Sequence, residues 1–254
     1  RKMTDIIIQG INGRMGKVLC ELIAQREDCR IVGGVDVSAQ SGPIPVAASL
    51  EELNAKADVI IDFSTPEATK SMLRYCQSTG TACVVCTTGL DEECEQLIHQ
   101  TAEKAPVFKS ANMSMGINLL AELAQKAAQV LGMDYDIEII EKHHHNKVDA
   151  PSGTALLLAD EINETTGNRY HYVYDRHSVR QKRDPHELGL HAIRGGSIVG
   201  DHDVLFCGPD EVITLSHSAG SRAVFANGAI NAAIFLTGYE KGLYNMKDLM
   251  RSLL

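Results

Sequence analysis

A run of fifteen residues, from Glu141 to Ala155, holds the side chains best suited to proton transfer. It contains three consecutive histidines, His143 to His145, followed by Lys147 and by the turn Ser152-Gly153-Thr154. Imidazole and ammonium groups deliver protons near neutral pH. A helix that begins near Pro151 would leave its first backbone N–H groups unpaired and would favour an anion there. The stretch therefore predicts an active site in which an anion binds beside proton donors.

Two other interpretations of this stretch require no catalysis. A capped helix preceded by a solvated basic loop would have the same composition. Imidazole is also the commonest zinc ligand, but consecutive residues of an extended chain point to opposite faces, so His143, His144 and His145 hardly converge on one ion. We therefore predict no metal site and keep the capped helix as the structural alternative.

Size and charge limit the partners of the chain. Its 254 residues, 44% of them hydrophobic, can bury a sizeable core in one or two domains. The net charge of -9 argues against nucleic acid or an anionic membrane surface as the main partner, because both require a basic footprint. An anionic small molecule then needs a local positive patch, for which Lys147, Arg194 and Arg222 are candidates.

The cysteines and the apolar runs indicate the compartment. Seven cysteines, an odd number without a framework spacing, favour a reducing cytosol. The pair Cys83 and Cys86 has the spacing of redox and zinc motifs, but positions three apart in a strand face opposite ways. We see no basic-then-apolar leader and no apolar run near the ~20 residues of a membrane span. We expect a cytoplasmic protein.

A second stretch has the pattern of a dinucleotide-binding turn. The apolar run 4–9 leads into Gly-Ile-Asn-Gly-Arg-Met-Gly at 10–16, then into a helical pattern and a strand that ends at Asp36. Glycines allow a tight turn close to a pyrophosphate, the helix start binds it, and the acid holds ribose hydroxyls. Asn12 replaces the usual middle glycine and tolerates left-handed backbone angles. An ordinary strand-to-helix turn is the alternative. The predicted cofactor contacts here are Gly10, Ile11, Asn12, Gly13, Arg14, Met15 and Asp36.

Strands and helices alternate as far as residue 113. Further strands are expected at 57–63, 81–86 and 106–109, with helices at 66–77 and 91–104 between them. This rhythm predicts an α/β domain with a doubly wound parallel (Rossmann) sheet, which binds ligands at the carboxyl ends of its strands.

After an expected helix at 115–131 the rhythm changes. Strands follow with little helix between them, which predicts a second α+β domain built on a mixed sheet. An apolar helix at 225–236 then returns to the first domain. We expect a dinucleotide-binding domain of residues 1–113 and 223–254, and a second domain of residues 114–222. The apolar stripe expected on the long helix comprises Ile117, Leu120, Leu123, Ala124, Ala127 and Val130.

Five further motifs stand out along the chain: Phe63-Ser64-Thr65-Pro66, Thr87-Thr88-Gly89, Asn112-Met113-Ser114-Met115-Gly116, 143–155 and Phe225-Ala226-Asn227-Gly228-Ala229. With these motifs and the glycine-rich turn, nearly the whole chain resembles the 4-hydroxy-tetrahydrodipicolinate reductase family, also called dihydrodipicolinate reductase, of lysine and diaminopimelate biosynthesis. The resemblance implies an oxidoreductase that adds hydride from a nicotinamide cofactor to a cyclic unsaturated dicarboxylic imine. It also implies that residues 114–222 form a substrate-binding and oligomerisation domain, through which the family usually assembles as a homotetramer.

The resemblance also implies roles for single residues. His143 matches the family's proton donor or acceptor, and Lys147 matches its proton donor. Cys86 stands where glycine is usual and Met113 where phenylalanine is usual, so the cofactor wall is expected to have a different shape. The substrate carboxylates would be contacted by His144, Gly153 and Thr154, together with Ser152 of the helix start. The walls near the nicotinamide would be Cys86, Thr87, Thr88, Ser110, Ala111, Asn112 and Met113.

Cofactor choice depends on the surroundings of Asp36. Val37 follows it, and no adjacent arginine or lysine is available for a 2′-phosphate, so we predict that NADH is preferred. NADPH is not excluded, since Lys2 or the loop 38–41 could fold over the site. Two other functions remain open. Another nicotinamide-dependent dehydrogenase of amino-acid metabolism would need its own catalytic group, and a non-catalytic dinucleotide sensor would not need His143 and Lys147.

Overall fold

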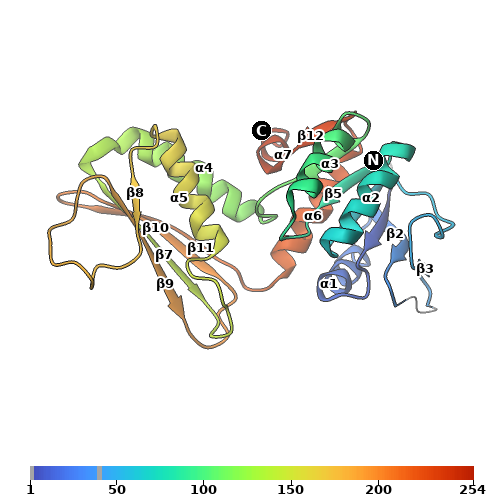
Figure 1. The fold of residues 1–254 in the computed structure, drawn as a ribbon, viewed down its shortest axis with the longest axis horizontal. Coiled ribbons are helices and arrows are strands. Elements are labelled where there is room, and N and C mark those ends of the chain that lie inside the picture. The colour runs from blue at the N-terminus through green and yellow to red at the C-terminus, as the bar shows by residue number, and fades with distance from the viewer. Residues whose placement is uncertain (1–2, 39–41) are drawn as a thin grey trace. The chain divides into compact units, whose positions relative to one another are not determined.

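A computed structural model describes residues 3–38 and 42–254, and the chain forms two compact units (Figure 1). The first comprises Arg1–Ser114 with Arg222–Leu254, and the second comprises Met115–Ser221. Each junction differs by one residue from the limits expected from the sequence. The nucleotide and substrate roles of the two units stay predictions. Lys2 and residues 39–41, which we considered for NADPH binding, lie outside the described residues.

The first unit contains a parallel seven-stranded sheet in the order β12-β6-β5-β4-β1-β2-β3. Its central strands are buried on both faces, as the continuous apolar runs predict. The predicted doubly wound architecture is confirmed, but β3 and β12 were not predicted because they are too short to show a pattern. The strands are β1 (Thr4–Gln9), β2 (Cys29–Val35), β3 (Val46–Ala47), β4 (Val59–Asp62), β5 (Ala82–Val85), β6 (Pro106–Lys109) and β12 (Gly242–Tyr244).

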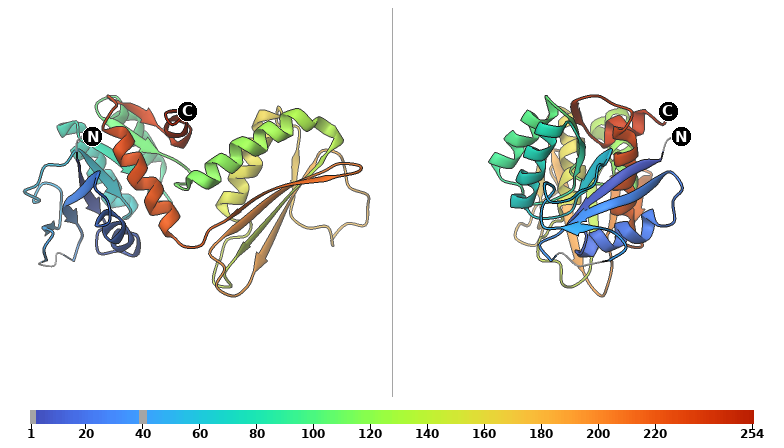
Figure 2. Two further views of the ribbon diagram at one scale, coloured as in Figure 1. Left: turned by 180° about the vertical axis from the view of Figure 1, so that it is seen from behind. Right: turned by 90° about the vertical axis from the view of Figure 1, so that its right-hand side faces the viewer.

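Helices cover both faces of this sheet. The right view of Figure 2 shows α2 and α3 on one face and α1 and α6 on the other. The helix α2 begins where the Thr65 side chain caps it and Pro66 occupies its first turn, and it ends at Gly80, which has a φ of 74°. The helix α6 packs against α1, β4, β5 and β6. The helices are α1 (Arg14–Ile23), α2 (Pro66–Thr79), α3 (Glu92–Ala102), α6 (Ala223–Leu236) and α7 (Met246–Arg251).

The second unit is a five-stranded mixed sheet in the order β11-β10-β7-β9-β8, which confirms the predicted second sheet. The strand β10 runs antiparallel to β7 and β11, whereas β9 runs parallel to β7 and β8. Its helices are α4 (Met115–Leu131) and α5 (Gly153–Thr165), with a short 3-10 turn, η1 (Gly132–Asp134). Its strands are β7 (Asp136–His143), β8 (His171–Val173), β9 (Glu187–Arg194), β10 (Asp201–Cys207) and β11 (Val212–Ser218).

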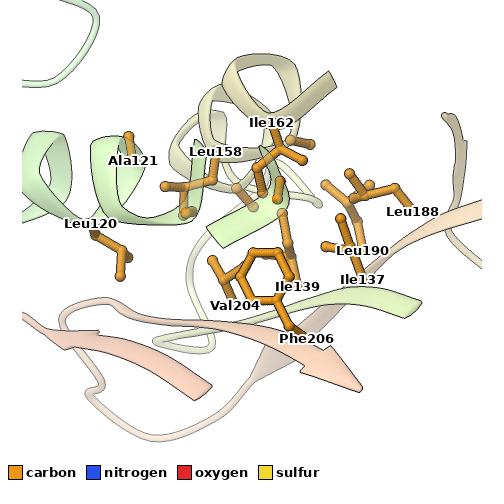
Figure 3. Packing of buried hydrophobic residues seen from close by; sticks show 14 of the residues in the cluster. Leu120, Ala121, Ile137, Ile139, Leu158, Ile162, Leu188, Leu190, Val204 and Phe206 are labelled. Atoms are coloured by element: carbon orange, nitrogen blue, oxygen red, sulfur yellow. The ribbon is translucent and has the colours of Figure 1, made fainter. Parts of the chain in front are cut away.

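One face of this sheet forms the core of the second unit with α4 and α5 (Figure 3). Alternate residues of β7, β9 and β10 point into it, among them Ile139, Leu190 and Val204. The same alternation carries Glu141 and His143 of β7 to this face, next to the apolar core. The fold thus places the predicted catalytic histidine at the polar end of a buried sheet face.

The apolar stripe of α4 differs from the expected one. Leu123 and Val130, predicted to be buried, are 48% and 71% exposed. Apolar residues occupy more of the circumference of α4 than the core covers, so spacing alone could not select the buried stripe. The buried residues of α4 are Ile117, Leu120, Ala121, Ala124 and Ala128.

Candidate active site

The glycine-rich turn after β1 depends on two glycines. Gly10 has a φ of 81°, and a Cβ built on it would lie 2.4 Å from the carbonyl oxygen of Phe63. A Cβ on Gly16 would lie 2.3 Å from the carbonyl oxygen of Gly10. Among the described residues, only Asn168 is a non-glycine residue with positive φ. Our reason for accepting Asn12, its tolerance of left-handed angles, was therefore wrong, because the left-handed residue of this turn is Gly10.

The start of α1 fits a bound pyrophosphate. Its N-cap residue is Gly13, and no side chain of the described residues caps the helix. The first N–H groups and the positive end of the helix dipole are therefore available to an anion. Arg14 is exposed and Met15 is half-buried, whereas Ile11 is buried under the turn. The segment therefore offers an anion an open helix start, while Ile11 packs beneath the turn.

Asp36 follows β2 and lies beside the same turn. Its Oδ2 accepts a hydrogen bond from the backbone N–H of Asn12 at 3.1 Å. Its Oδ1 accepts from the N–H and the hydroxyl of Ser38 at 3.0 and 2.8 Å. Desolvation raises the pKa of Asp36, but the hydrogen bonds from Ser38 and Asn12 outweigh it and lower the pKa. The carboxylate stays ionised at neutral pH and can accept hydrogen bonds from ribose hydroxyls.

A pocket of about 500 Å³ opens at the carboxyl ends of β5 and β6. Cys86 lines this pocket. Burial raises the pKa of its thiol well above the usual value, so the thiol is uncharged at neutral pH. Phe225 of α6 also lines the pocket, and so do Lys109 and Glu95, which form an ion pair. The structure brings together here all of the predicted wall residues, Cys86, Thr87, Thr88, Ser110, Ala111, Asn112 and Met113.

A buried carboxylate beneath this pocket was missed from the sequence. Asp62, at the end of β4, accepts hydrogen bonds from the hydroxyls of Thr87 at 2.9 Å and Thr69 at 2.6 Å. The Thr87 hydroxyl in turn accepts from the Ser64 N–H at 3.0 Å. Asp62 therefore fixes one pocket wall from below. In the sequence it lies near the end of the apolar strand expected at 57–63, and this pattern gave no sign of its role.

Glu141 is the centre of the polar network in the second unit. It is 0% exposed, and its Oε2 lies 2.6 Å from Nδ1 of His143 and 2.7 Å from Nη1 of Arg194. Its Oε1 accepts from Nη2 of Arg194 at 2.8 Å and from the Ser152 N–H at 3.0 Å. Desolvation raises the pKa of Glu141, but hydrogen bonds from Arg194, His143 and Ser152 outweigh it and lower the pKa.

This network fixes the state of two side chains. An ionised Glu141 only accepts hydrogen bonds, so Nδ1 of His143 carries the hydrogen and Nε2 is left for proton exchange. Gly200 makes room there, since a Cβ on it would lie 3.0 Å from Nε2. The guanidinium of Arg194 is held by Glu141 and by the carbonyl of Asp149 at 2.6 Å. Arg194, one of the candidates for a positive patch, is therefore paired with the Glu141 carboxylate.

His202 of β10 packs against His143. The two rings form an edge-to-face pair with centroids 5.2 Å apart, and Nε2 of His202 lies 3.1 Å from Oγ of Ser152. Burial, together with the nearby His143, lowers the pKa of His202 to about 4. His202 is therefore neutral at pH 7 and adds no charge beside His143. It was not predicted, because it lies about sixty residues away in the sequence.

The predicted substrate contacts at the start of α5 differ in exposure: one is buried, and two are at least partly exposed. Ser152 is buried, and its hydroxyl caps the helix by accepting the Ala155 N–H at 3.1 Å. Its own N–H is bound to Glu141. Gly153 is exposed, and a Cβ on it would meet no described atom within 4 Å. Thr154 is half-buried beside it. The helix starts two residues after the predicted Pro151, and its open side is at Gly153.

His144 and Lys147 lie in the loop between β7 and α5. Both are half-buried, and Nδ1 of His144 is buried without a hydrogen-bond partner among the described residues. The Lys147 ammonium lies 2.8 Å from Oδ1 of Asp149, and this pair lowers the pKa of the Asp149 carboxyl. Because Asp149 is exposed and Lys147 is half-buried, this ion pair is weak and can exchange with water or a ligand. Lys147 is thus a cation that an anionic ligand can recruit.

Within the described part of the chain, no three or more histidine, cysteine or acidic side chains are grouped to hold a metal ion. The seven cysteines are free thiols. The described helices include none with the length and apolarity needed to cross a bilayer.

Comparison with known proteins gives matches along nearly the whole chain. The family models described as dihydrodipicolinate reductase, N-terminus, and dihydrodipicolinate reductase, C-terminus, match residues 4–113 and 116–250. The 4-hydroxy-tetrahydrodipicolinate reductase of Caldanaerobacter subterraneus subsp. tengcongensis is 48% identical over 249 residues, which cover 98% of this chain and 99% of that protein. The protein of the same name from Clostridium tetani is 46% identical over 251 residues, which cover 98% of both chains.

A solved structure gives a similar match. The dipicolinate-bound dihydrodipicolinate reductase from Paenisporosarcina sp. TG-14 has a TM-score of 0.78 and 26% sequence identity to this chain. The match covers 96% of this chain and 97% of that one. The likeness thus includes both units, each with its own sheet.

Proposed function

The chain belongs to the dihydrodipicolinate reductase family, an oxidoreductase family of lysine and diaminopimelate biosynthesis, and on this premise we propose which of its residues bind and protonate the substrate and which dinucleotide it uses. In this proposal the chain reduces 4-hydroxy-tetrahydrodipicolinate. The observation that carries this conclusion is the match to a reductase of that name over nearly the full length of both chains. The uncapped start of α1 and the Glu141 network support it.

The first unit binds the nicotinamide dinucleotide in this proposal. The N–H groups at the start of α1, from Gly13 to Met15, bind the pyrophosphate, and Asp36 accepts the ribose hydroxyls. The nicotinamide occupies the pocket between Cys86 and Met113, where Asp62 holds the Thr87 wall. When bound, the reduced dinucleotide supplies a hydride.

The second unit binds the dicarboxylate and supplies the proton. His144, Gly153 and Thr154 contact the carboxylates, since an open helix start and an imidazole favour anions. Ser152 supports the start of α5 from beneath the substrate site, because its N–H and hydroxyl are engaged with Glu141, Ala155 and His202. Reduction of a double bond conjugated with the imine requires one proton, which Lys147 or Nε2 of His143 donates.

We propose that NADH is the preferred dinucleotide. A 2′-phosphate would meet the ionised Asp36, and the described residues beside it, Val37 and Ser38, carry no positive charge. The values of kcat/KM for NADH and NADPH should be compared at matched ionic strength, since salt screens phosphate contacts. A clear advantage for NADPH would contradict this assignment and would point to a basic partner distant in the sequence.

We further propose that the enzyme is a cytoplasmic homotetramer assembled through the second unit. The family resemblance supports the assembly. The free cysteines and the acidic charge support the location. Light scattering on a size-exclusion column tests the assembly, and a monomeric mass at micromolar concentration would refute it.

One assay tests the reaction itself. The purified protein is mixed with NADH or NADPH and with freshly generated substrate, and the nicotinamide absorbance is followed. It should fall in proportion to the substrate added. Binding of dinucleotide without oxidation would favour the alternative of a sensor. Oxidation only with another substrate would favour a different dehydrogenase of amino-acid metabolism.

A further inference from the structure

Asn12 connects the glycine-rich turn to the segment that follows β2. Its side-chain Nδ2 donates to the carbonyl oxygen of Ser38 at 2.7 Å and lies 3.3 Å from the Ser38 hydroxyl. Its backbone N–H donates to Oδ2 of Asp36 at 3.1 Å. A glycine at position 12, as in the usual fingerprint, would keep the backbone bond and lose both side-chain bonds. Asn12 therefore adds a link that the common pattern lacks.

This link restrains the Asp36 carboxylate from both sides. Ser38 donates its N–H and its hydroxyl to Oδ1, at 3.0 and 2.8 Å, while Asn12 donates to Oδ2. Three of the roughly four acceptor positions of the carboxylate are occupied, and the remaining position is on Oδ2. The carboxylate cannot rotate away without breaking bonds to Ser38, and Asn12 holds Ser38 in place.

We infer that Asn12 is a specificity-determining residue, whose side chain keeps Asp36 directed at the dinucleotide ribose and so maintains discrimination against a 2′-phosphate. This inference rests on the proposed function, because it requires that the turn binds a nicotinamide dinucleotide. A ribose hydroxyl can donate to the free position on Oδ2. A 2′-phosphate, which carries nearly two negative charges at pH 7, has no proton to offer there and meets a carboxylate that cannot withdraw.

The experiment measures equilibrium binding, which needs no turnover. Dissociation constants for NADH and NADPH are measured by calorimetry on the full chain, for the wild type, Asn12→Gly and Asn12→Ala. The exposed Asn54 supplies a matched control, Asn54→Ala. We expect both Asn12 variants to narrow the NADH-to-NADPH affinity ratio by about fivefold, the effect of roughly one hydrogen bond. The control should keep the wild-type ratio.

A double-mutant cycle with Asp36 separates this role from a general effect on the turn. In an Asp36→Ala background, Asn12→Gly should leave the affinity ratio unchanged, because the restrained group is gone. The inference is overturned if the Asn12 variants keep the wild-type ratio, or if they weaken both dinucleotides equally. A wild-type protein that binds neither dinucleotide would refute the proposed function together with the inference. Normal wild-type binding with an unchanged ratio would refute the inference alone.

Discussion

The two ring nitrogens of His143 lie in different surroundings. Nδ1 is held by Glu141, and Nε2 lies beside Gly200, where the absence of a side chain leaves room. If Nε2 of His143 and the Lys147 ammonium both take part in the proton transfer, His143→Ala and Lys147→Ala should each lower turnover by about 10²-fold or more. NADH affinity should hardly change, because the proposed dinucleotide contacts belong to the first unit.

The neighbouring histidine provides the control for that experiment. His145 is exposed, and the bond it forms with Gly196 uses its backbone N–H, which alanine retains. His145→Ala should therefore keep nearly full turnover. Stopped-flow measurement of a single turnover isolates the chemical step. If either His143→Ala or Lys147→Ala reacts at the wild-type rate there, the role of that residue is wrong.

We expect Glu141 to matter for the stability of the fold as well as for the site. Glu141→Gln removes the charge but retains the shape, and it leaves the Arg194 guanidinium without its buried partner. Removing one member of a buried ion pair typically costs about 3–5 kcal/mol, and we expect a loss of that order in the free energy of unfolding. Urea denaturation measures it. Glu164→Gln, an exposed change on α5, should cost less than about 0.5 kcal/mol.

At the scale of elements, the polar ends of β7 and β10 make stability depend on pH. The pKa of His202 is about 4 in the folded chain, against 6.5 for an ordinary histidine, so the folded state favours the neutral ring. Between these values the unfolded chain binds a proton that the folded chain does not. The contribution of His202 to the free energy of unfolding is therefore fully present above pH 6.5. It falls by about 3 kcal/mol as the pH drops towards 4.

A variant isolates that contribution. His202→Gln has no ring to protonate, so its urea midpoint should change less with pH between 6.5 and 4.5 than that of the wild type. Part of the slope will remain, because burial also lowers the pKa of His217 on β11. Glu141 adds a loss at lower pH, as its pKa is below the usual 4.5. Identical slopes for variant and wild type would show that His202 does not titrate in this range.

The sequence predicted long elements better than short or polar ones. Apolar runs predicted the central strands, whereas β3 and β12 have two and three residues and carry no pattern. The strand β7 continues through Glu141 and Lys142 to His143, because β9 and β10 pair with it on both sides. Propensity could not show this, since Glu141 and Lys142 are poor strand formers.

The candidate site was predicted where its residues are neighbours in the sequence. The turn at Gly10 and the stretch from His143 to Thr154 each lie on one loop or helix start, so their spacing was informative. The contacts among its buried residues were not predicted, and Arg194 was considered only for a positive patch. Glu141, Arg194 and His202 meet only because three strands align them, and the register of strands is not visible in one sequence.

At the scale of the whole molecule, the second unit is one continuous segment inserted into the first. Residues 115–221 contain both α4 and α5 and all five strands of their sheet, with a core of their own. We expect this segment, expressed alone, to unfold in a single cooperative thermal transition, followed by circular dichroism. Residues 1–114 alone lack α6 and β12 and should show no such transition. A segment 115–221 without cooperative unfolding would contradict this expectation.

The late position of α6 has a consequence for synthesis on the ribosome. This helix packs on β4, β5 and β6, yet it begins only at Ala223. At about 5–20 residues per second, those strands wait on the order of ten seconds for it while the inserted segment is being made. During this delay an apolar sheet face lacks its cover and is open to chaperones and to other nascent chains. A chain that stops after β6 but before Ala223 should therefore aggregate instead of forming a shortened enzyme.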